Sequence, residues 1–323
     1  MARGGRILIL GNGFDIDLGL KTSYRDFMNN EKYWPFVGEP ENYSPLGQEM
    51  KKIKEDNWYD IERALLKFAK SYRLSTNPFD RDPNVFINCR FDYESLVSAL
   101  AEYLQVQQDE GEINADSVAF RVLKRLLNDT SLDAIYSFNY TEIKRILQRI
   151  PGLPSITIPI VNVHGKLHDH TLILGVNEKE ELNYKQFQYL YKTFNRHYQS
   201  NNLRYDILTA QEVIIFGHSL SEVDYSYFEE FFYSLCHRDD DKATKRKVTI
   251  FTYDEVSELE IKRWLRSMDQ VQIELLYGYN DFQFICTRYA NDSTSVDGRR
   301  LRDFLFHIRT TALDGILKFQ ESE

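Results

Sequence analysis

Short apolar runs alternate with longer amphipathic segments along much of the chain. The runs have the length and composition of strands buried on both faces, and they lie at residues 6–10, 134–138, 158–163, 213–216, 248–253 and 271–276. A shorter run, 171–176, predicts a further strand paired nearby. Segments with apolar residues three and four positions apart, such as 225–236 and 255–268, follow several runs and predict helices. Strands that alternate with helices predict a parallel sheet with right-handed crossovers.

The region between the first two predicted strands departs from this alternation. Helical spacing recurs there at residues 24–30, 46–72, 91–108 and 117–127, and segments 31–47 and 74–91 have the Pro, Asn and Asp content of loops. The sequence therefore predicts an α/β fold, a Rossmann-like, mostly parallel sheet made of residues 1–30 and 130–323. A large helical insertion, residues 31–129, follows the first strand-helix unit. Further helices are predicted at 142–149, 178–210 and 301–319, and residues 278–298 are expected to be irregular.

Composition narrows the classes of function. The 323 residues suit one α/β domain with a large insertion, and the formal net charge of -9 offers no broad attraction for nucleic acid. The three cysteines are far apart in the sequence, which suits a reducing cytoplasm and predicts no zinc module. No apolar run approaches the roughly 20 residues of a membrane helix, and we see no signal peptide.

Polar or glycine clusters follow four of the predicted strands. These clusters are Gly11-Asn12-Gly13, Asn139-Tyr140-Thr141, His164-Gly165 and Gly217-His218-Ser219. In open parallel sheets the ligand lies beyond the carboxyl ends of the strands. The sequence therefore predicts that four distant segments converge on one cleft.

The first cluster has the order strand, glycine turn and helix start that is typical of a phosphate-binding turn. Gly11, Asn12, Gly13 and Phe14 would bring backbone N–H groups to a nucleotide, although Ile16 stands where the dinucleotide fingerprint has a third glycine. A structural glycine turn is an equally simple interpretation. A carboxylate repels phosphate, so we expect Asp15 to meet a ribose hydroxyl or to hold the loop.

The remaining strand ends carry side chains that suit hydrolysis or sugar binding. Asn139 can position a ribose hydroxyl or a water molecule, or it can cap the next helix. An imidazole can take up a proton near neutral pH, so His164 can serve as a general base, although a lone histidine at a strand end is usually structural. His168 and His170 lie close in sequence, but the intervening Lys166 and Asp169 favour a hairpin turn over a metal site.

The last cluster offers a hydroxyl and a carboxylate. Ser219, beside Gly217, can bond to phosphate or ribose. Asp224 stands at a predicted helix start, where it can cap the helix or instead contact a base or ribose.

Four sequence blocks resemble a known family. GNGFDIDLGLKTSYRDF, SFNYT, VNVHGKL and FGHSLSEVDYSYF look like the AbiH family of bacterial phage abortive-infection proteins, and the resemblance covers most of the chain. The block order is also remotely similar to the sirtuin-like, NAD-consuming Rossmann domains of antiphage systems. That similarity implies that Asn139 and His164 are catalytic, and that the glycine turn and Ser219 contact the dinucleotide. Two departures are the missing four-cysteine zinc module and Thr141, where the sirtuin pattern often has Asp.

Three functions follow from these observations. The first is hydrolysis of NAD to nicotinamide and ADP-ribose, gated by a trigger, by homo-oligomer formation or by a defence-system partner. The second is a non-catalytic sensor that binds a related nucleotide, which Thr141 favours. The third is a metal-dependent nuclease with Asp15, Asp17 and Glu62 around Mg²⁺, which the acidic balance disfavours.

Overall fold

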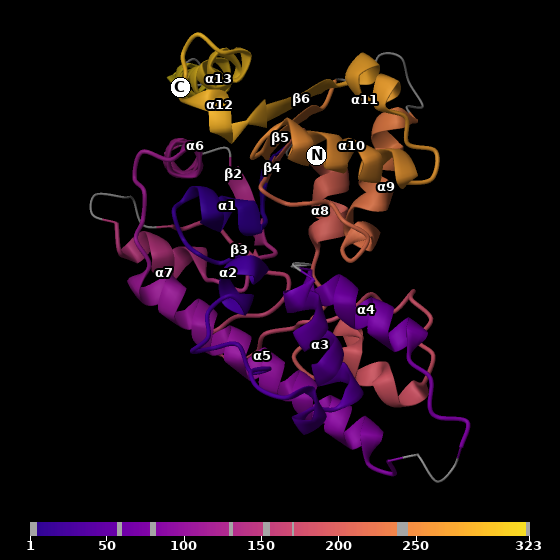
Figure 1. Cartoon of the computed structure of the whole chain (residues 1–323). Coiled ribbons are helices and arrows are strands. Elements are labelled where there is room, and N and C mark those ends of the chain that lie inside the picture. Colours follow the sequence, from indigo (N-terminus) through magenta and orange to yellow (C-terminus); the bar gives the residue numbers. More distant parts are fainter. Residues whose placement is uncertain are drawn as a thin grey trace.

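A computed structural model describes residues 5–56, 60–77, 82–128, 132–150, 156–169, 171–237 and 245–320, with side chains up to residue 308. Within these ranges, six parallel strands form one sheet (Figure 1). They are β1 (Arg6–Leu10), β2 (Leu132–Ser137), β3 (Ile160–Asn162), β4 (Glu212–Phe216), β5 (Lys247–Thr252) and β6 (Asp281–Cys286). Their order, β3-β2-β1-β4-β5-β6, is that of a Rossmann fold, which confirms the predicted fold class.

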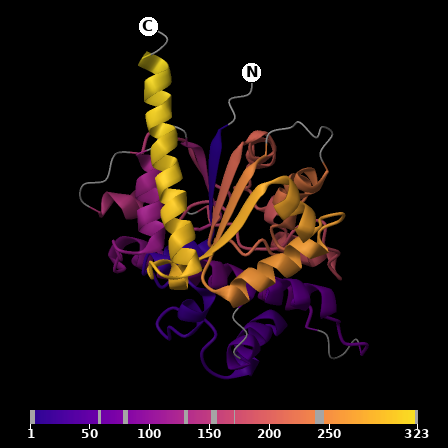
Figure 2. The same cartoon turned by 90° about the horizontal axis from the view of Figure 1, so that it is seen from above.

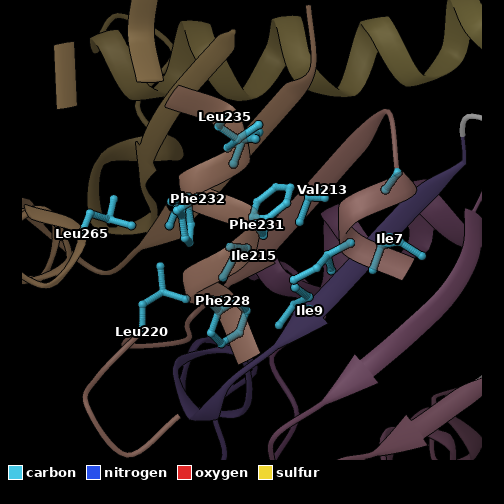
Figure 3. Packing of buried hydrophobic residues seen from close by; sticks show 14 of the residues in the cluster. Ile7, Ile9, Val213, Ile215, Leu220, Phe228, Phe231, Phe232, Leu235 and Leu265 are labelled. Atoms are coloured by element: carbon cyan, nitrogen blue, oxygen red, sulfur yellow. The ribbon is translucent and has the colours of Figure 1, made fainter. Parts of the chain in front are cut away.

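Both faces of the sheet are buried, which explains why its strands read as continuous apolar runs rather than alternating ones. One face of β1 and β4 packs against α9 (Tyr225–Cys236), and Figure 3 shows Phe228 and Phe231 of this helix beside Ile9 and Ile215. Helices α8 (Leu203–Thr209), α10 (Glu255–Ser267) and α11 (Ile273–Tyr279) complete that layer.

The opposite face of the sheet packs against helices from both ends of the chain. They are α1 (Asn12–Asp17), α6 (Val118–Leu127), α7 (Ile143–Gln148), α12 (Thr287–Ala290) and α13 (Val296–Gln320). Figure 2 shows α13, in yellow, running along one side of the sheet while α10 lies on the other. Helices therefore cover both faces of the sheet.

A second group of helices has its own hydrophobic core. It contains α2 (Tyr24–Met28), the short 3₁₀ turn η1 (Pro40–Asn42), α3 (Pro45–Glu55), α4 (Ile61–Ser71) and α5 (Val85–Glu110). The 3₁₀ turns η3 (Lys185–Leu190) and η4 (Lys192–Phe194) lie in a later segment whose buried residues share this core. Figure 2 shows the described part of residues 45–110 at one end of the sheet. The predicted domain boundaries remain a prediction.

Several predicted elements differ from the observed ones. The helix predicted over 46–72 is two helices, because the Asp60 carboxylate accepts the Arg63 N–H at 3.0 Å and starts a new helix. Residues 57–59 of that prediction lie outside the described residues. Helix α5 begins at Val85, so part of the predicted loop 74–91 is helical.

The prediction was also wrong in four later segments. One of them, residues 278–298, was expected to be irregular but contains β6, α12 and the start of α13. Residues 171–176 form only an isolated bridge, from Val176 to Tyr191, and the helix predicted over 178–210 is replaced by η3, η4 and α8. The run 271–276 contributes to helix α11, whereas the sixth strand is residues 281–286. Short apolar runs have no distinctive period, so tertiary packing decides between strand and helix.

In the part of the chain that the structure describes, no helix combines the length and apolarity needed to span a membrane.

Candidate functional site

A cavity of about 310 Å³ lies beyond the carboxyl ends of β1, β2, β3 and β4, and we call it the first pocket. The predicted site residues that line it are Gly11, Asn12, Asp15, Asn139, His164, Gly217, Ser219 and Asp224. Gly13 and Phe14 are outside the lining, and the Phe14 ring packs edge-on against Phe216 in the core. Helices of the second group reach the same cavity, through Glu62 of α4 and Leu100 of α5. The structure therefore brings together four strand ends and one wall of the helical group.

The glycine turns after β1 and β4 are pressed against each other. A Cβ atom on Gly11 would lie 2.5 Å from the Cα of His218, and one on Gly13 would lie 2.7 Å from the Cα of Gly217. The Gly11 N–H donates to the Phe216 carbonyl and the Gly13 N–H to the Gly217 carbonyl, both at 2.9 Å. Gly217 has a φ of +65°, which suits glycine. These glycines therefore allow the close contact of two backbones. The N–H groups of Gly11, Gly13 and Phe14, three amides of the expected phosphate turn, already have backbone acceptors.

Asp15 ties the β1 end to the β2 end. Its carboxylate accepts hydrogen bonds from the Asn139 Nδ2, at 2.8 Å, and from the Thr141 hydroxyl. Burial raises the pKa of Asp15 to about 6, although both hydrogen bonds oppose the shift. In the same turn, the Asn12 Oδ1 accepts from the Thr22 hydroxyl at 2.6 Å. Asp15 thus holds the β1 and β2 ends together, and Thr141 donates one of its two hydrogen bonds.

This arrangement fixes the Asn139 side chain at the first pocket. It is 7% exposed, and it is not the cap of the next helix, since α7 begins at Ile143 after Glu142. Its Nδ2 is used by Asp15, while its Oδ1 is buried and has no hydrogen-bond partner among the described residues. A buried acceptor without a partner costs free energy, which a donor from a ligand or water would recover.

Asp224 joins two histidines at the other side of the first pocket. Its Oδ1 lies 3.1 Å from the His164 Nε2, and its Oδ2 lies 3.4 Å from the His218 Nε2. The Leu220 N–H donates to the His218 Nδ1 at 2.9 Å, so the proton of a neutral His218 is on Nε2 and faces Asp224. Although Asp224 precedes α9, its side chain makes no capping hydrogen bond. The carboxylate thus orients imidazoles rather than the helix.

A buried lysine completes this cluster. The Lys192 Nζ lies 3.0 Å from the Asp224 Oδ1, 3.1 Å from the Glu62 Oε1 and 3.2 Å from the His164 Nε2. Burial alone would raise the pKa of Asp224, but the Lys192 ammonium and the His164 and His218 imidazoles outweigh it and hold this pKa well below its usual range. Burial also raises the pKa of Glu62 against the attraction of Lys192. The cluster is therefore built around one buried cation and two carboxylates.

Sequence reasoning missed Lys192 and the role of His218, and it named Glu62 only for the nuclease. Lys192 lies in η4, inside a segment that we expected to be one long helix, so its position near Asp224 was not visible. His218 stands within the predicted Gly217-His218-Ser219 cluster, which was the only available signal for it.

The first pocket is rich in carboxylates. Asp15, Asp60, Glu62 and Asp224 line it, whereas neither lysine nor arginine is among its described lining residues. Aromatic side chains, Tyr24, Phe138 and Tyr140, form part of the wall. The cavity is at the small end of the range of about 300–1,000 Å³ for small-molecule sites. These features suit a compact, cationic or uncharged group with hydroxyls.

The three carboxylates of the nuclease hypothesis, Asp15, Asp17 and Glu62, do not form one site. The Asp17 Oδ2 accepts the Ala119 N–H at 2.7 Å, and Asp17 is outside the lining of the first pocket that holds Asp15 and Glu62. Among the described residues, no group of three or more His, Cys, Asp or Glu side chains is arranged to hold a metal ion. His170, part of the sequence cluster with His164 and His168, lies outside the described residues.

Comparison with known proteins gives one family. A family model with the description "Bacteriophage abortive infection AbiH" matches residues 7–244. A search of curated proteins finds no match for this chain. The matched region contains the four strand ends that line the first pocket, together with Glu62 and Lys192.

Proposed function

The chain belongs to the bacteriophage abortive infection AbiH family, and from this premise we propose that it is an antiphage effector that hydrolyses NAD to nicotinamide and ADP-ribose in the first pocket. Depletion of NAD would stop the infected host and, with it, the phage. The observation that carries the proposal is the Asn139 carboxamide, which is fixed by Asp15 and presents an unpartnered Oδ1 in the same cavity as His164.

The fixed carboxamide is suited to a ribose. A ribose hydroxyl or a water molecule can donate to the Asn139 Oδ1, which otherwise has no partner in the described structure. Because Asp15 holds the Asn139 side chain and Thr141 in turn holds Asp15, little entropy is lost when a ligand binds. Asn139 would thereby set the position of the sugar carbon at which the glycosidic bond breaks.

The His164–Asp224 pair is suited to proton transfer. When the His164 Nε2–H donates to Asp224, the Nδ1 of His164 is the basic nitrogen, and the carboxylate stabilises the imidazolium that forms. In the proposed step, the oxygen of water forms a bond to C1′ of the ribose while the bond from C1′ to nicotinamide breaks. Nicotinamide leaves as a neutral molecule with the bonding electron pair, and the water proton goes to His164.

The charge of the first pocket also supports this substrate. The nicotinamide ring of NAD is cationic, and the transition state of such a cleavage resembles an oxocarbenium ion. Four lining carboxylates offset by one nearby lysine favour both species over a phosphate group. We therefore expect the nicotinamide-ribose end to enter the pocket and the pyrophosphate to lie toward its mouth.

Release of nicotinamide from NAD by the purified chain tests the proposal. His164→Ala should lower the rate roughly a hundredfold or more if this residue is the general base. Asn139→Ala should also lower it. The matched control is His168→Ala, because His168 is exposed and lies outside the lining of the first pocket. Equal rates for the parent and His164→Ala would reject the assignment of the base.

The non-catalytic sensor remains the second candidate, and Lys192 favours it. In this structure the Lys192 Nζ approaches the His164 Nε2 and Asp224 Oδ1, so part of the hydrogen-bonding capacity of the pair is occupied. Thermal stabilisation by NAD without nicotinamide release, lost in Asn139→Ala, would support the sensor instead of the enzyme.

A further inference from the structure

A second, larger cavity lies between α5 and the η3–η4 segment, and we call it the second pocket. Its volume is about 570 Å³. The lining consists of Arg90, Tyr93, Glu94, Val97, Ser98, Ala101, Leu167, Leu172, Tyr189, Phe194, Asn195, Arg196 and His197. It shares no lining residue with the first pocket. The volume is within the range of about 300–1,000 Å³ that is typical of small-molecule sites.

The charges of the second pocket are opposite to those of the first. Arg90 and Arg196 carry guanidinium groups, and His197 adds an imidazole whose Nε2 accepts from the Arg196 Nε at 3.0 Å. Among the described lining residues only Glu94 is acidic, and its Oε1 is 2.9 Å from the Arg90 Nε. The balance favours an anion, and planar guanidinium groups match a phosphate with two parallel hydrogen bonds.

The inner wall of the second pocket is apolar and aromatic. Leu167 and Leu172 are buried, and the rings of Tyr93 and Tyr189 lie with centroids 5.3 Å apart. The Arg90 guanidinium lies 6.0 Å from the centroid of the Tyr189 ring. Phe194 presents an exposed ring at the same cavity. A planar apolar group could therefore be held between rings, below a cationic rim.

The Tyr189 hydroxyl is the most specific indication of a ligand. It is fully buried and has no hydrogen-bond partner among the described residues, whereas the neighbouring Tyr93 hydroxyl donates to the Leu174 carbonyl at 2.6 Å. A buried hydroxyl without a partner is unfavourable, and phenylalanine would fill the same space without this cost. A polar edge of a bound molecule would supply the missing partner.

We infer that the second pocket binds a nucleotide. Its phosphate would be held by Arg90 and Arg196, its base would lie against the apolar wall, and a polar edge of the base would bond to the Tyr189 hydroxyl. An acidic, aromatic peptide has the same charge and ring chemistry. The compact volume and the buried position of the hydroxyl favour the smaller ligand.

The second pocket is joined to the first by a very short segment. Lys192 and Phe194 are the first and last residues of η4, and they belong to the ion cluster and to the second pocket, respectively. The Asn195 N–H donates to the Lys192 carbonyl at 3.2 Å, which ties the two positions through the backbone. A nucleotide at Phe194 and Arg196 would thus contact the chain within a few residues of the lysine that faces His164.

Calorimetric titration of the full chain with AMP, GMP, CMP and UMP tests the inference. We expect at least one of them to bind with a Kd below about 1 mM. Tyr189→Phe should weaken binding about tenfold while the melting temperature stays the same or rises, because only a partnerless hydroxyl is removed. Arg196→Gln should also weaken binding.

Two controls separate this cavity from the first pocket. Asn139→Ala should leave the affinity unchanged, and so should Arg266→Gln, an exposed arginine of α10 outside both linings. The inference is overturned if none of the four nucleotides binds, if Tyr189→Phe and Arg196→Gln bind as well as the parent, or if binding is lost in Asn139→Ala. Binding of an acidic aromatic peptide without any nucleotide binding would also overturn it.

Discussion

The two pockets border the same long helix, α5, yet their charged groups are held in different ways. Beside the first pocket, the side chains of Lys192 and of the lining residue Asp224 are 7% and 10% exposed and bond to each other. In the second, those of Arg90 and Glu94 are 63% and 56% exposed. Buried charges are stable only with their partners, so the ion cluster at the first pocket is part of the fold. Exposed charges contribute little to folding and are available to a ligand.

The difference also concerns the backbone. The first pocket is made by strand ends whose turns are hydrogen-bonded to each other, as in the Gly13 N–H to the Gly217 carbonyl. The second is made by one face of α5 and by short 3₁₀ turns. A site on strand ends can keep reacting groups in fixed positions, whereas short turns can adjust to a ligand.

The largest effect is expected from the removal of the buried cation. Lys192→Met keeps the length of the side chain but leaves Asp224 and Glu62 buried without their ammonium partner. The free energy of unfolding should fall by about 3–5 kcal/mol, as measured by urea denaturation. The control is Lys179→Met, since the Lys179 side chain is 66% exposed. A loss no greater than that of the control would show that the buried cluster does not stabilise the fold.

The next effect concerns the pH dependence of the first pocket. Burial raises the pKa of Asp15 to about 6 in the folded chain, above its usual value of 3.8. The native state therefore retains a proton that the unfolded chain releases, and this stabilisation is present below about pH 4 and lost as the pH rises through about 6. Relative to Asp15→Asn, the parent should lose about 3 kcal/mol of unfolding free energy over that interval. If the difference in unfolding free energy between the parent and Asp15→Asn stayed constant with pH, the raised pKa of Asp15 would be contradicted.

A smaller effect is expected at the contact of the two glycine turns. Gly217→Ala places a side chain at φ +65° and against the backbone of Gly13 and Phe14, so we expect a loss of about 2 kcal/mol in thermal or urea unfolding. Gly278→Ala is the contrast, because an added Cβ there has no neighbour within 4 Å and the residue lies in α11. That variant should be equal to the parent or more stable by up to about 1 kcal/mol.

The smallest effect is expected in the second pocket. Arg90→Gln removes an exposed i,i+4 pair with Glu94, so the free energy of unfolding should change by less than about 0.5 kcal/mol. Urea denaturation at low and high salt measures this change. A loss comparable to that of Lys192→Met would mean that the charges of both pockets are structural, and the contrast between the pockets would disappear.

The four strand ends that contribute to the first pocket followed from local sequence, whereas the order of the strands came from the structure. Gly11, Asn139, His164 and Gly217 follow apolar runs. In a parallel sheet the carboxyl ends of the strands share one edge, so these residues come together there regardless of how the insertion folds. The apolar run at 271–276 gave the wrong element, because its composition fits a buried helix and a strand equally well.

The sequence by itself determined the α/β fold, its family and the strand ends that meet in the first pocket, since these depend on short-range patterns and fixed strand geometry. Only the tertiary structure decided the partners of those residues. Lys192 forms ion pairs with Asp224 and Glu62, which lie 32 and 130 positions away in the sequence. The Tyr189 ring packs against Tyr93 of α5. Contacts between residues so far apart in sequence depend on how irregular segments pack, and local hydrophobic periodicity does not predict them.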